Sequence, residues 1–280
     1  MKYLILNADD FGYNPQQTKA ITELYEKGLI TSTSLMTVAE DACNAAEIAR
    51  EKSFAVGVHL TVNSDSASNP WQSISGAKSL GTDGLYESQK DLAIHATRAD
   101  IRKELEAQYA FLIASGCTVD HADNHCGTLY GINGRRFFID AFDFCARHGL
   151  PYRFPKTPYF LERQLGRKIP HAVVLLQKAI VGCGEKRGVK MLDDIVPDPR
   201  PIEQIGSYEN LREYYLDAVR SCIEGVTEMF FHPAYPQDDT FGGWTKRVYE
   251  FELLKSGDIL ECAADNGVKV VSWSIFENIV

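Results

Sequence analysis

The 280-residue sequence is acidic, with 29 Lys and Arg residues, 38 Asp and Glu residues and a formal net charge of −9 at pH 7. This charge argues against non-specific binding to nucleic acid or to an anionic membrane, because both need a surplus of positive charge. The length suits a single (β/α)-barrel domain over residues 1–280. The apolar runs are too short to span a membrane, which suggests a cytoplasmic protein. The seven cysteines include no Cys-x-x-Cys pair, which suggests that they are reduced.

A short apolar run at the start of the chain leads into Asp9 and Asp10, and this pattern predicts a buried strand that ends in polar residues. Neighbouring strand residues point to opposite faces, so both carboxylates reach one site only if the chain bends, which Gly12 permits. Helix capping is the alternative role for the pair. However, Asn14 and Pro15 already supply an N-cap and a first-turn proline, which leaves the aspartates free to bind a cation or accept a proton.

Helical and strand patterns then alternate along the chain. The predicted helices cover 15–27, 41–52, 99–114, 135–148, 171–181, 208–223 and 247–266, and the predicted strands cover 31–38, 54–60, 119–124, 152–154, 228–232 and 268–274. This order predicts a parallel sheet, because a helix supplies the crossover between parallel neighbours. With about seven such units we expect an α/β fold of the (β/α)-barrel type, TIM-like but distorted or incomplete.

Two segments lack a clear period. Residues 61–88 are rich in Ser, Gly and Asn, and a loop of this length predicts a lid over the site. Residues 156–206 combine prolines, glycines and basic residues, and we interpret them as an irregular insertion that shapes specificity or subunit contacts.

Catalytic groups of such barrels gather at the C-terminal ends of the strands. The residues at these predicted ends are Asp9 and Asp10, His59, Asp123 and His125, Arg153, and His232. Two histidines and a carboxylate with an open position form a common ligand set for a hydrolytic divalent metal. These strand ends therefore predict a metal-dependent hydrolytic site.

Each histidine also has a structural alternative. His59 would serve equally as a hydrogen-bonded core residue, and Pro233 gives His232 a structural role where the chain leaves its strand. His121 shares a strand face with His125, and we choose His125 because it lies nearer the C-terminal end. The remaining histidines, which we expect at the surface or in packing, are His95, His148 and His171.

Five short motifs follow one another along the chain. They are Asn7-Ala8-Asp9-Asp10-Phe11-Gly12, Gly57-Val58-His59-Leu60, Asp123-Asn124-His125, Arg153-Phe154-Pro155 and Phe231-His232-Pro233. In this order they resemble the motifs of the YdjC-like carbohydrate deacetylases, which include the chitooligosaccharide deacetylases. The first motif is specific, and the order of the set adds weight to the shorter ones.

The resemblance implies that Asp10, His59 and His125 bind the metal and that Asp9 is the catalytic base. Members of the family often carry further histidines after the Asp-x-His motif. This chain has Cys126 and a glycine there, which predicts a smaller pocket wall.

Further roles follow from the chemistry of amide hydrolysis. An amine leaves poorly unless it is protonated, so we expect His232 to donate that proton. Arg153 would orient Asp9, as a similar arginine does in the related NodB-type deacetylases, or would hold substrate oxygens. Candidates for stacking on a sugar ring are Trp71, Tyr86 and Tyr130, each of which is otherwise a packing residue.

We therefore predict a hydrolase that uses one divalent metal, Mg or Zn, to remove N-acetyl groups from an amino sugar or short chitooligosaccharide, with or without a phosphate. A metal-dependent phosphoester or other amide hydrolase is one alternative. A sugar-binding protein without turnover is another, although simple binding requires neither Asp9 nor His232. The expected partner is a small carbohydrate, and a homodimer is the default assembly.

Overall fold

Nine strands, all paired in parallel, form the centre of the fold in the computed structural model, which describes residues 1–238 and 243–278. They follow the order β6-β5-β4-β3-β2-β1-β8-β7, and β9 pairs with β1. Their bounds are β1 Lys2–Phe11, β2 Ser32–Leu35, β3 Ala55–Leu60, β4 Thr118–Asn124, β5 Tyr152–Pro155, β6 Met191–Leu192, β7 Asp194–Val196, β8 Gly225–Phe231 and β9 Val268–Val270.

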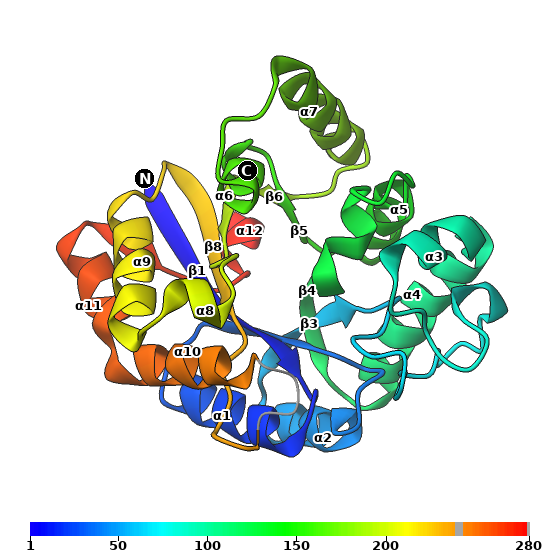
Figure 1. Cartoon of the computed structure of the whole chain (residues 1–280), viewed down its shortest axis with the longest axis horizontal. Coiled ribbons are helices and arrows are strands. Elements are labelled where there is room, and N and C mark those ends of the chain that lie inside the picture. The colour runs from blue at the N-terminus through cyan, green and yellow to red at the C-terminus, as the bar shows by residue number, and fades with distance from the viewer. Residues whose placement is uncertain (239–242, 279–280) are drawn as a thin grey trace.

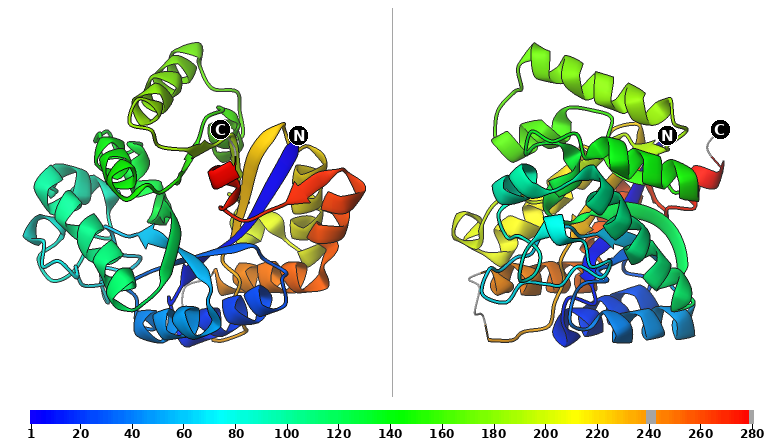
Figure 2. Two further views of the ribbon diagram at one scale, coloured as in Figure 1. Left: turned by 180° about the vertical axis from the view of Figure 1, so that it is seen from behind. Right: turned by 90° about the vertical axis from the view of Figure 1, so that its right-hand side faces the viewer.

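Helices surround these strands, as Figures 1 and 2 show. The α-helices are α1 Pro15–Glu26, α2 Ala42–Lys52, α3 Gln89–His95, α4 Arg98–Ala114, α5 Phe138–His148, α6 Tyr159–Leu165, α7 His171–Glu185, α8 Ile202–Ile205, α9 Tyr208–Arg220, α10 Trp244–Ser256, α11 Asp258–Asp265 and α12 Ile275–Asn278. The described part of the chain also forms two short 3-10 helices, η1 Lys78–Leu80 and η2 His125–Tyr130. Among the described residues, no helix has both the length and the apolar character needed to span a membrane.

The strands β6 and β7 close the sheet into a barrel. β6 pairs with β5, whereas β7, which begins after one intervening residue, pairs with β8. One continuous piece of chain therefore contacts both ends of the strand order, and the strands are arranged around a centre in Figure 1. The predicted distorted (β/α) barrel is confirmed.

The structure corrects several expected elements. The segment 156–206 is not simply irregular, because it holds β6 and β7 in addition to α7, the helix expected near 171–181. The single helix expected over 247–266 is wrong, since Gly257, at φ +82°, separates α10 from α11. The strand expected over 268–274 is also too long, because β9 ends at Val270.

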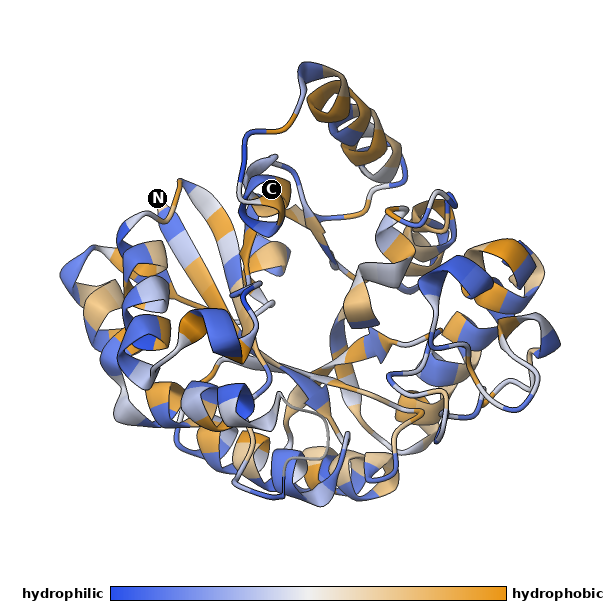
Figure 3. Cartoon of the chain, in the orientation of Figure 1, coloured by the Kyte–Doolittle hydropathy of each residue, from blue (hydrophilic) through white to orange (hydrophobic). Residues whose placement is uncertain are grey.

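Two apolar clusters lie on the two sides of the strands. Leu4, Leu6 and Ala8 of β1 belong to the large cluster that includes the surrounding helices. Ile5 points the other way and packs with Trp273 in a smaller cluster that also contains residues of β6, β7 and β8. Figure 3 shows the hydrophobic colouring along these strands. Ile5 lies four residues before Asp9 on β1, so this small cluster lies on the same face of the strand as Asp9 and nearer the start of the strand.

Gly57 on β3 makes room for the ring of His121 on β4. A Cβ atom at position 57 would lie 2.2 Å from His121 Nε2. The His121 ring stacks on Trp273, with ring centroids 4.5 Å apart and planes 8° apart, so that it cannot move away freely. His121 therefore belongs to a packed layer inside the barrel, one level below Asp123 on the same strand.

We expect Gly57→Ala to lower the free energy of unfolding by about 1–3 kcal/mol, the usual cost of overpacking a core. Gly182→Ala on α7 is the matched control, because no described atom outside its own helix lies within 4 Å of a Cβ built there. Alanine in place of glycine inside a helix stabilises by about 1 kcal/mol. Urea denaturation followed by circular dichroism measures both variants, and an unchanged midpoint for Gly57→Ala would contradict this packing account.

Candidate active site

A sharp bend at the end of β1 brings two neighbouring aspartates to one site. Asp10 has a φ of +64° and Gly12 a φ of +95°, so the chain leaves the strand geometry between them. The side chain of Gln17 donates to the carbonyl oxygen of Asp9 at 3.1 Å and supports the bend. Asn14 accepts the N–H of Gln17 at 2.9 Å and caps α1. The expected N-cap is therefore confirmed, and neither aspartate is used for it.

Three possible metal ligands converge where β1, β3 and β4 end. His59 Nε2 lies 3.3 Å from Asp10 Oδ1, His125 Nδ1 lies 3.5 Å from the same oxygen, and the two nitrogens are 3.3 Å apart. All three side chains are buried. Ligand atoms about 2.1 Å from a tetrahedral ion are separated by about 3.4 Å. The triangle therefore has the dimensions of one face of a metal coordination shell.

Carboxylates hold the other nitrogen of each histidine. His59 Nδ1 lies 2.8 Å from Asp123 Oδ1, and His125 Nε2 lies 2.7 Å from Asp65 Oδ1. Each carboxylate can accept a hydrogen bond from the ring N–H beside it, so in the neutral rings the lone pairs of His59 Nε2 and His125 Nδ1 would point toward Asp10. This is the arrangement in which histidines bind metals in proteins.

The surrounding charges favour a positive charge at this triangle. Burial alone would lower the pKa of His59, but Asp123 and Asp10 raise it to about 10. Burial also opposes a charge on His125, whereas Cys126 and Asp10 contribute to a pKa well above the ordinary value. Burial would raise the pKa of Asp10, but the two histidines hold it well below the ordinary value. A bound metal cation would be stabilised by the same negative groups that here favour protons on the two histidines.

An unsatisfied buried atom supports the fit to a cation. Asp10 Oδ1 is buried and accepts no hydrogen bond from the described residues. A second group with close ligand atoms combines His59 with Asp9 and Asp123. In that group both carboxylates already contact Arg153, so the set around Asp10 fits a metal better.

Arg153 on β5 gathers three carboxylates inside the barrel. Its Nη1 and Nη2 donate to the two oxygens of Asp9 at 2.7 Å each, and its Nε and Nη2 donate to Glu228 at 2.8 Å each. Asp123 Oδ2 lies 2.9 Å from Nη2. Burial opposes the charge of Arg153, but these carboxylates raise its pKa well above the ordinary value. The guanidinium therefore fixes Asp9 in a bidentate ion pair.

His232 follows β8 and approaches Asp9 from the open side. Its Nε2 lies 4.0 Å from Asp9 Oδ2, and its side chain is 33% exposed. The backbone N–H of His232 donates to Glu250 at 2.6 Å, and the ring Nδ1 lies 3.9 Å from the same carboxylate oxygen. Burial lowers the pKa of His232 below its ordinary value. The ring is thus reachable from outside and close to both Asp9 and Glu250.

Besides Glu228 and Glu250, two further charged residues of the site were not predicted from the sequence. Arg247 on α10 donates to Asp10 Oδ2 at 3.1 Å and to Gln17 at 2.8 Å, which leaves Asp10 Oδ1 directed at the histidines. Asp65, the partner of His125, comes from the loop after β3. Neither residue stands at the end of a strand, and no spacing in the sequence predicts these contacts.

The three aromatic residues expected to stack on a sugar lie in different surroundings. The ring of Trp71 meets the ring of His125 edge-on, with centroids 5.4 Å apart. Tyr86 packs against His95, with centroids 5.5 Å apart. The Tyr130 hydroxyl donates to a backbone carbonyl of β5 at 2.7 Å. Of these three, Trp71 is the residue placed directly beside a histidine of the triangle.

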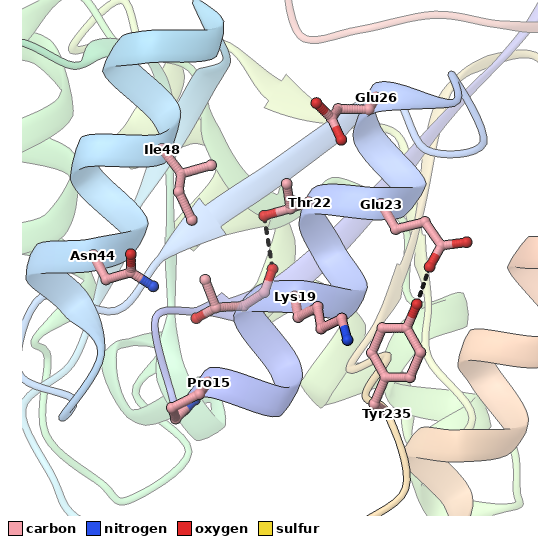
Figure 4. A pocket seen from close by; sticks show the side chains of 9 residues that line it. Pro15, Lys19, Thr22, Glu23, Glu26, Asn44, Ile48 and Tyr235 are labelled. Carbon is pink, nitrogen blue, oxygen red and sulfur yellow. Dashed lines mark hydrogen bonds between the residues drawn. The ribbon is translucent and has the colours of Figure 1, made fainter.

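A separate cavity of about 340 Å³ lies between α1 and α2 (Figure 4). Its lining includes Lys19, Glu23 and Tyr235, and the Tyr235 hydroxyl donates to Glu23. None of the aspartates and histidines described above belongs to this lining. The cavity is therefore distinct from the candidate active site.

Similarity to known proteins extends over nearly the whole chain. Carbohydrate deacetylases from Thermoanaerobacter pseudethanolicus and from human are 27% and 28% identical, covering 99% and 95% of this chain and 100% and 88% of the relatives. A chitooligosaccharide deacetylase from Proteus mirabilis is 36% identical over 44% of this chain and 48% of its own length.

A solved structure has the same fold. It is a proposed cellobiose-phosphate cleavage protein from Enterococcus faecalis, with a TM-score of 0.76 and 25% identity over 98% of each chain. The family model for YdjC-like protein matches residues 3–265, a range that runs from β1 to the end of α11. The chain therefore belongs to the YdjC-like protein family.

Proposed function

We propose that this protein is a metal-dependent carbohydrate deacetylase that hydrolyses the acetamide of an N-acetylated amino sugar or short chitooligosaccharide. The observation that carries the proposal is the triangle of Asp10, His59 and His125 beside Asp9. Similarity to carbohydrate deacetylases over the full chain supports the substrate class.

Asp10, His59 and His125 would hold the metal. A divalent ion bound there would polarise the amide carbonyl and lower the pKa of a water molecule. Two imidazoles and one carboxylate suit zinc or another transition metal, whereas magnesium prefers oxygen ligands. We therefore propose zinc or magnesium, with zinc favoured by the ligand types.

Asp9 would act as the general base. Its Oδ1 accepts hydrogen bonds from Asn7 and Arg153, both at 2.7 Å, while its Oδ2 accepts one from Arg153. A carboxylate oxygen has two lone pairs, so Oδ2 keeps one available for the proton of the attacking water. The same oxygen lies 4.0 Å from Nε2 of the partly exposed His232, which supports this role for Asp9.

His232 would act as the general acid for the leaving amine. Its partial exposure lets it reach a substrate, and Glu250 holds the chain at this point through the backbone N–H. Burial lowers the pKa of His232, which makes its protonated form a readier proton donor.

Arg153 would be a positioning residue for Asp9. Its guanidinium binds both oxygens of Asp9 and both oxygens of Glu228, so the base cannot rotate without breaking parallel hydrogen bonds.

Trp71 beside His125 would contact the sugar ring. Sugar contacts by Tyr86 and Tyr130, a phosphate on the sugar, a homodimer and a cytoplasmic location stay predictions.

The proposal predicts that metal-loaded protein releases acetate from diacetylchitobiose or its 6-phosphate, and that removal of the metal by a chelator abolishes the release. Re-addition of zinc or magnesium should restore it, and an enzyme-coupled acetate assay with parallel metal analysis measures both states. Acetate release that persists in demonstrably metal-free protein would contradict the metal dependence. Release of inorganic phosphate instead of acetate would favour a phosphoester hydrolase.

For the base, we expect Asp9→Asn to lower kcat by about 10²–10⁴-fold, because the amide cannot accept the proton. Metal content should stay at the wild-type level, since Asp10, His59 and His125 are intact. Asp265→Asn, at an exposed position on α11, is the matched control and should keep full activity. If Asp9→Asn turned over substrate at the wild-type rate, Asp9 would not be the general base.

For Arg153, we expect Arg153→Gln to lower the free energy of unfolding by about 3–5 kcal/mol, because it leaves buried carboxylates without their cation. Arg220→Gln removes an arginine that is 45% exposed and should change stability by less than about 0.5 kcal/mol. Urea denaturation of the two variants measures the difference. Equal losses of unfolding free energy in the two variants would show that the buried ion pairs of Arg153 stabilise the fold no more than surface ion pairs do.

A further inference from the structure

The long segment after β3 docks on one face of α4. Asp100, Glu104 and Gln108 are four residues apart and therefore share that face. Gln108 exchanges two hydrogen bonds, of 2.9 and 2.6 Å, with the backbone of the first residue of the segment. Asp100 accepts the N–H of Ser79 at 2.9 Å. We call residues 61–79 the docked loop.

Glu104 is the central anchor of the docked loop. The residue is 0% exposed, and its carboxylate accepts a hydrogen bond from the Ser73 hydroxyl at 2.5 Å. It also accepts the backbone N–H groups of Ile74 and Ser75 at 3.1 Å each. A buried carboxylate is costly unless hydrogen bonds satisfy it, and here the loop supplies three of its donors. Undocking the loop would leave this charge poorly satisfied.

The other part of the docked loop reaches the proposed metal site. Asp65 Oδ1 lies 2.7 Å from His125 Nε2, and the Trp71 ring meets the His125 ring edge-on. Ser64 connects the two contacts, because its hydroxyl accepts the N–H of Trp71 at 3.1 Å. The loop therefore contacts His125 through the ring nitrogen that does not face Asp10.

The two histidines of the site differ in what orients them. The carboxylate that holds His59 belongs to Asp123, a buried residue of β4. The carboxylate that holds His125 belongs to Asp65, which is 30% exposed and carried by the docked loop. One ligand is thus oriented by the barrel and the other by a loop.

We propose that Asp65 is a positioning residue that couples docking of this loop to metal binding, an inference that rests on the proposed metal site. By accepting a hydrogen bond from the Nε2–H group of His125, Asp65 fixes the tautomer whose Nδ1 is free to bind a cation. The ligand set is fully oriented only while the loop is docked on α4. Linkage makes the effect mutual, so the bound cation favours the docked loop by the same factor.

The first test is a calorimetric titration of the full chain with Zn²⁺ and with Mn²⁺. Asp65→Ala is expected to raise the dissociation constant 10–100-fold, the usual effect of losing the partner of a metal-ligating histidine. Asp65→Asn should recover part of the affinity, because its amide oxygen still accepts a hydrogen bond. Asp83→Asn, at a nearby exposed position, is the matched control and should bind as the wild type does.

The second test follows the loop itself by hydrogen exchange. Zinc should slow the exchange of peptides from 64–75 in the wild type and should have little effect on them in Asp65→Ala. Glu104→Gln, which weakens the distant anchor, should also reduce zinc affinity, although Glu104 contacts the loop and Gln108 and not the ligand triangle. If Glu104→Gln does not fold, the two measurements on Asp65→Ala decide the question.

The outcomes separate this inference from the proposed function. A wild type that binds neither metal would contradict the metal site on which the proposal rests. A wild type that binds zinc with the same affinity as Asp65→Ala would overturn the coupling and leave the metal site standing. Unchanged exchange of the loop in zinc-loaded wild type would overturn it as well.

Discussion

A single buried guanidinium, that of Arg153, organises the polar interior of this barrel. It contacts Asp9 on β1, Asp123 on β4 and Glu228 on β8, so side chains from four strands meet at one cation. Carboxylates packed this closely would repel one another in a low-dielectric interior without a positive charge between them. The apolar cluster and the metal-ligand triangle are therefore separated by a layer of carboxylates that Arg153 of β5 neutralises.

Asp123 extends this network from the proposed base to the proposed metal ligands. One of its oxygens lies beside Arg153 and the other holds His59 Nδ1. Asp9 is bound by the same guanidinium, so a continuous set of contacts joins the base to one metal ligand through the core of the barrel. The second histidine, His125, is oriented from outside by a loop. The site thus combines a rigid half, built by strands, with a half that depends on docking of a surface segment.

The sequence is sufficient to predict the barrel and the convergence of the strand-end residues, because the carboxyl ends of parallel strands meet regardless of their separation along the chain. The choice of Asp10 over Asp9 as a metal ligand came from the family resemblance. It is not sufficient for β6 and β7, since strands of two and three residues carry no period. Nor does it predict Asp65 or Arg247, which reach the site only through tertiary contacts. Asp65 meets a histidine 60 residues away, and Arg247 meets an aspartate 237 residues away. The chemical roles of all these side chains stay predictions.

The most direct test of the account is a crystal structure of zinc-loaded protein, with diffraction recorded on both sides of the zinc absorption edge. We predict one anomalous peak within about 2.3 Å of Asp10 Oδ1, His59 Nε2 and His125 Nδ1, the normal range of zinc bond lengths. Asp9 should remain paired with Arg153 and should not bind the ion. A peak between Asp9 and Asp123 instead would contradict the assignment of ligand and base, and with it the proposed mechanism.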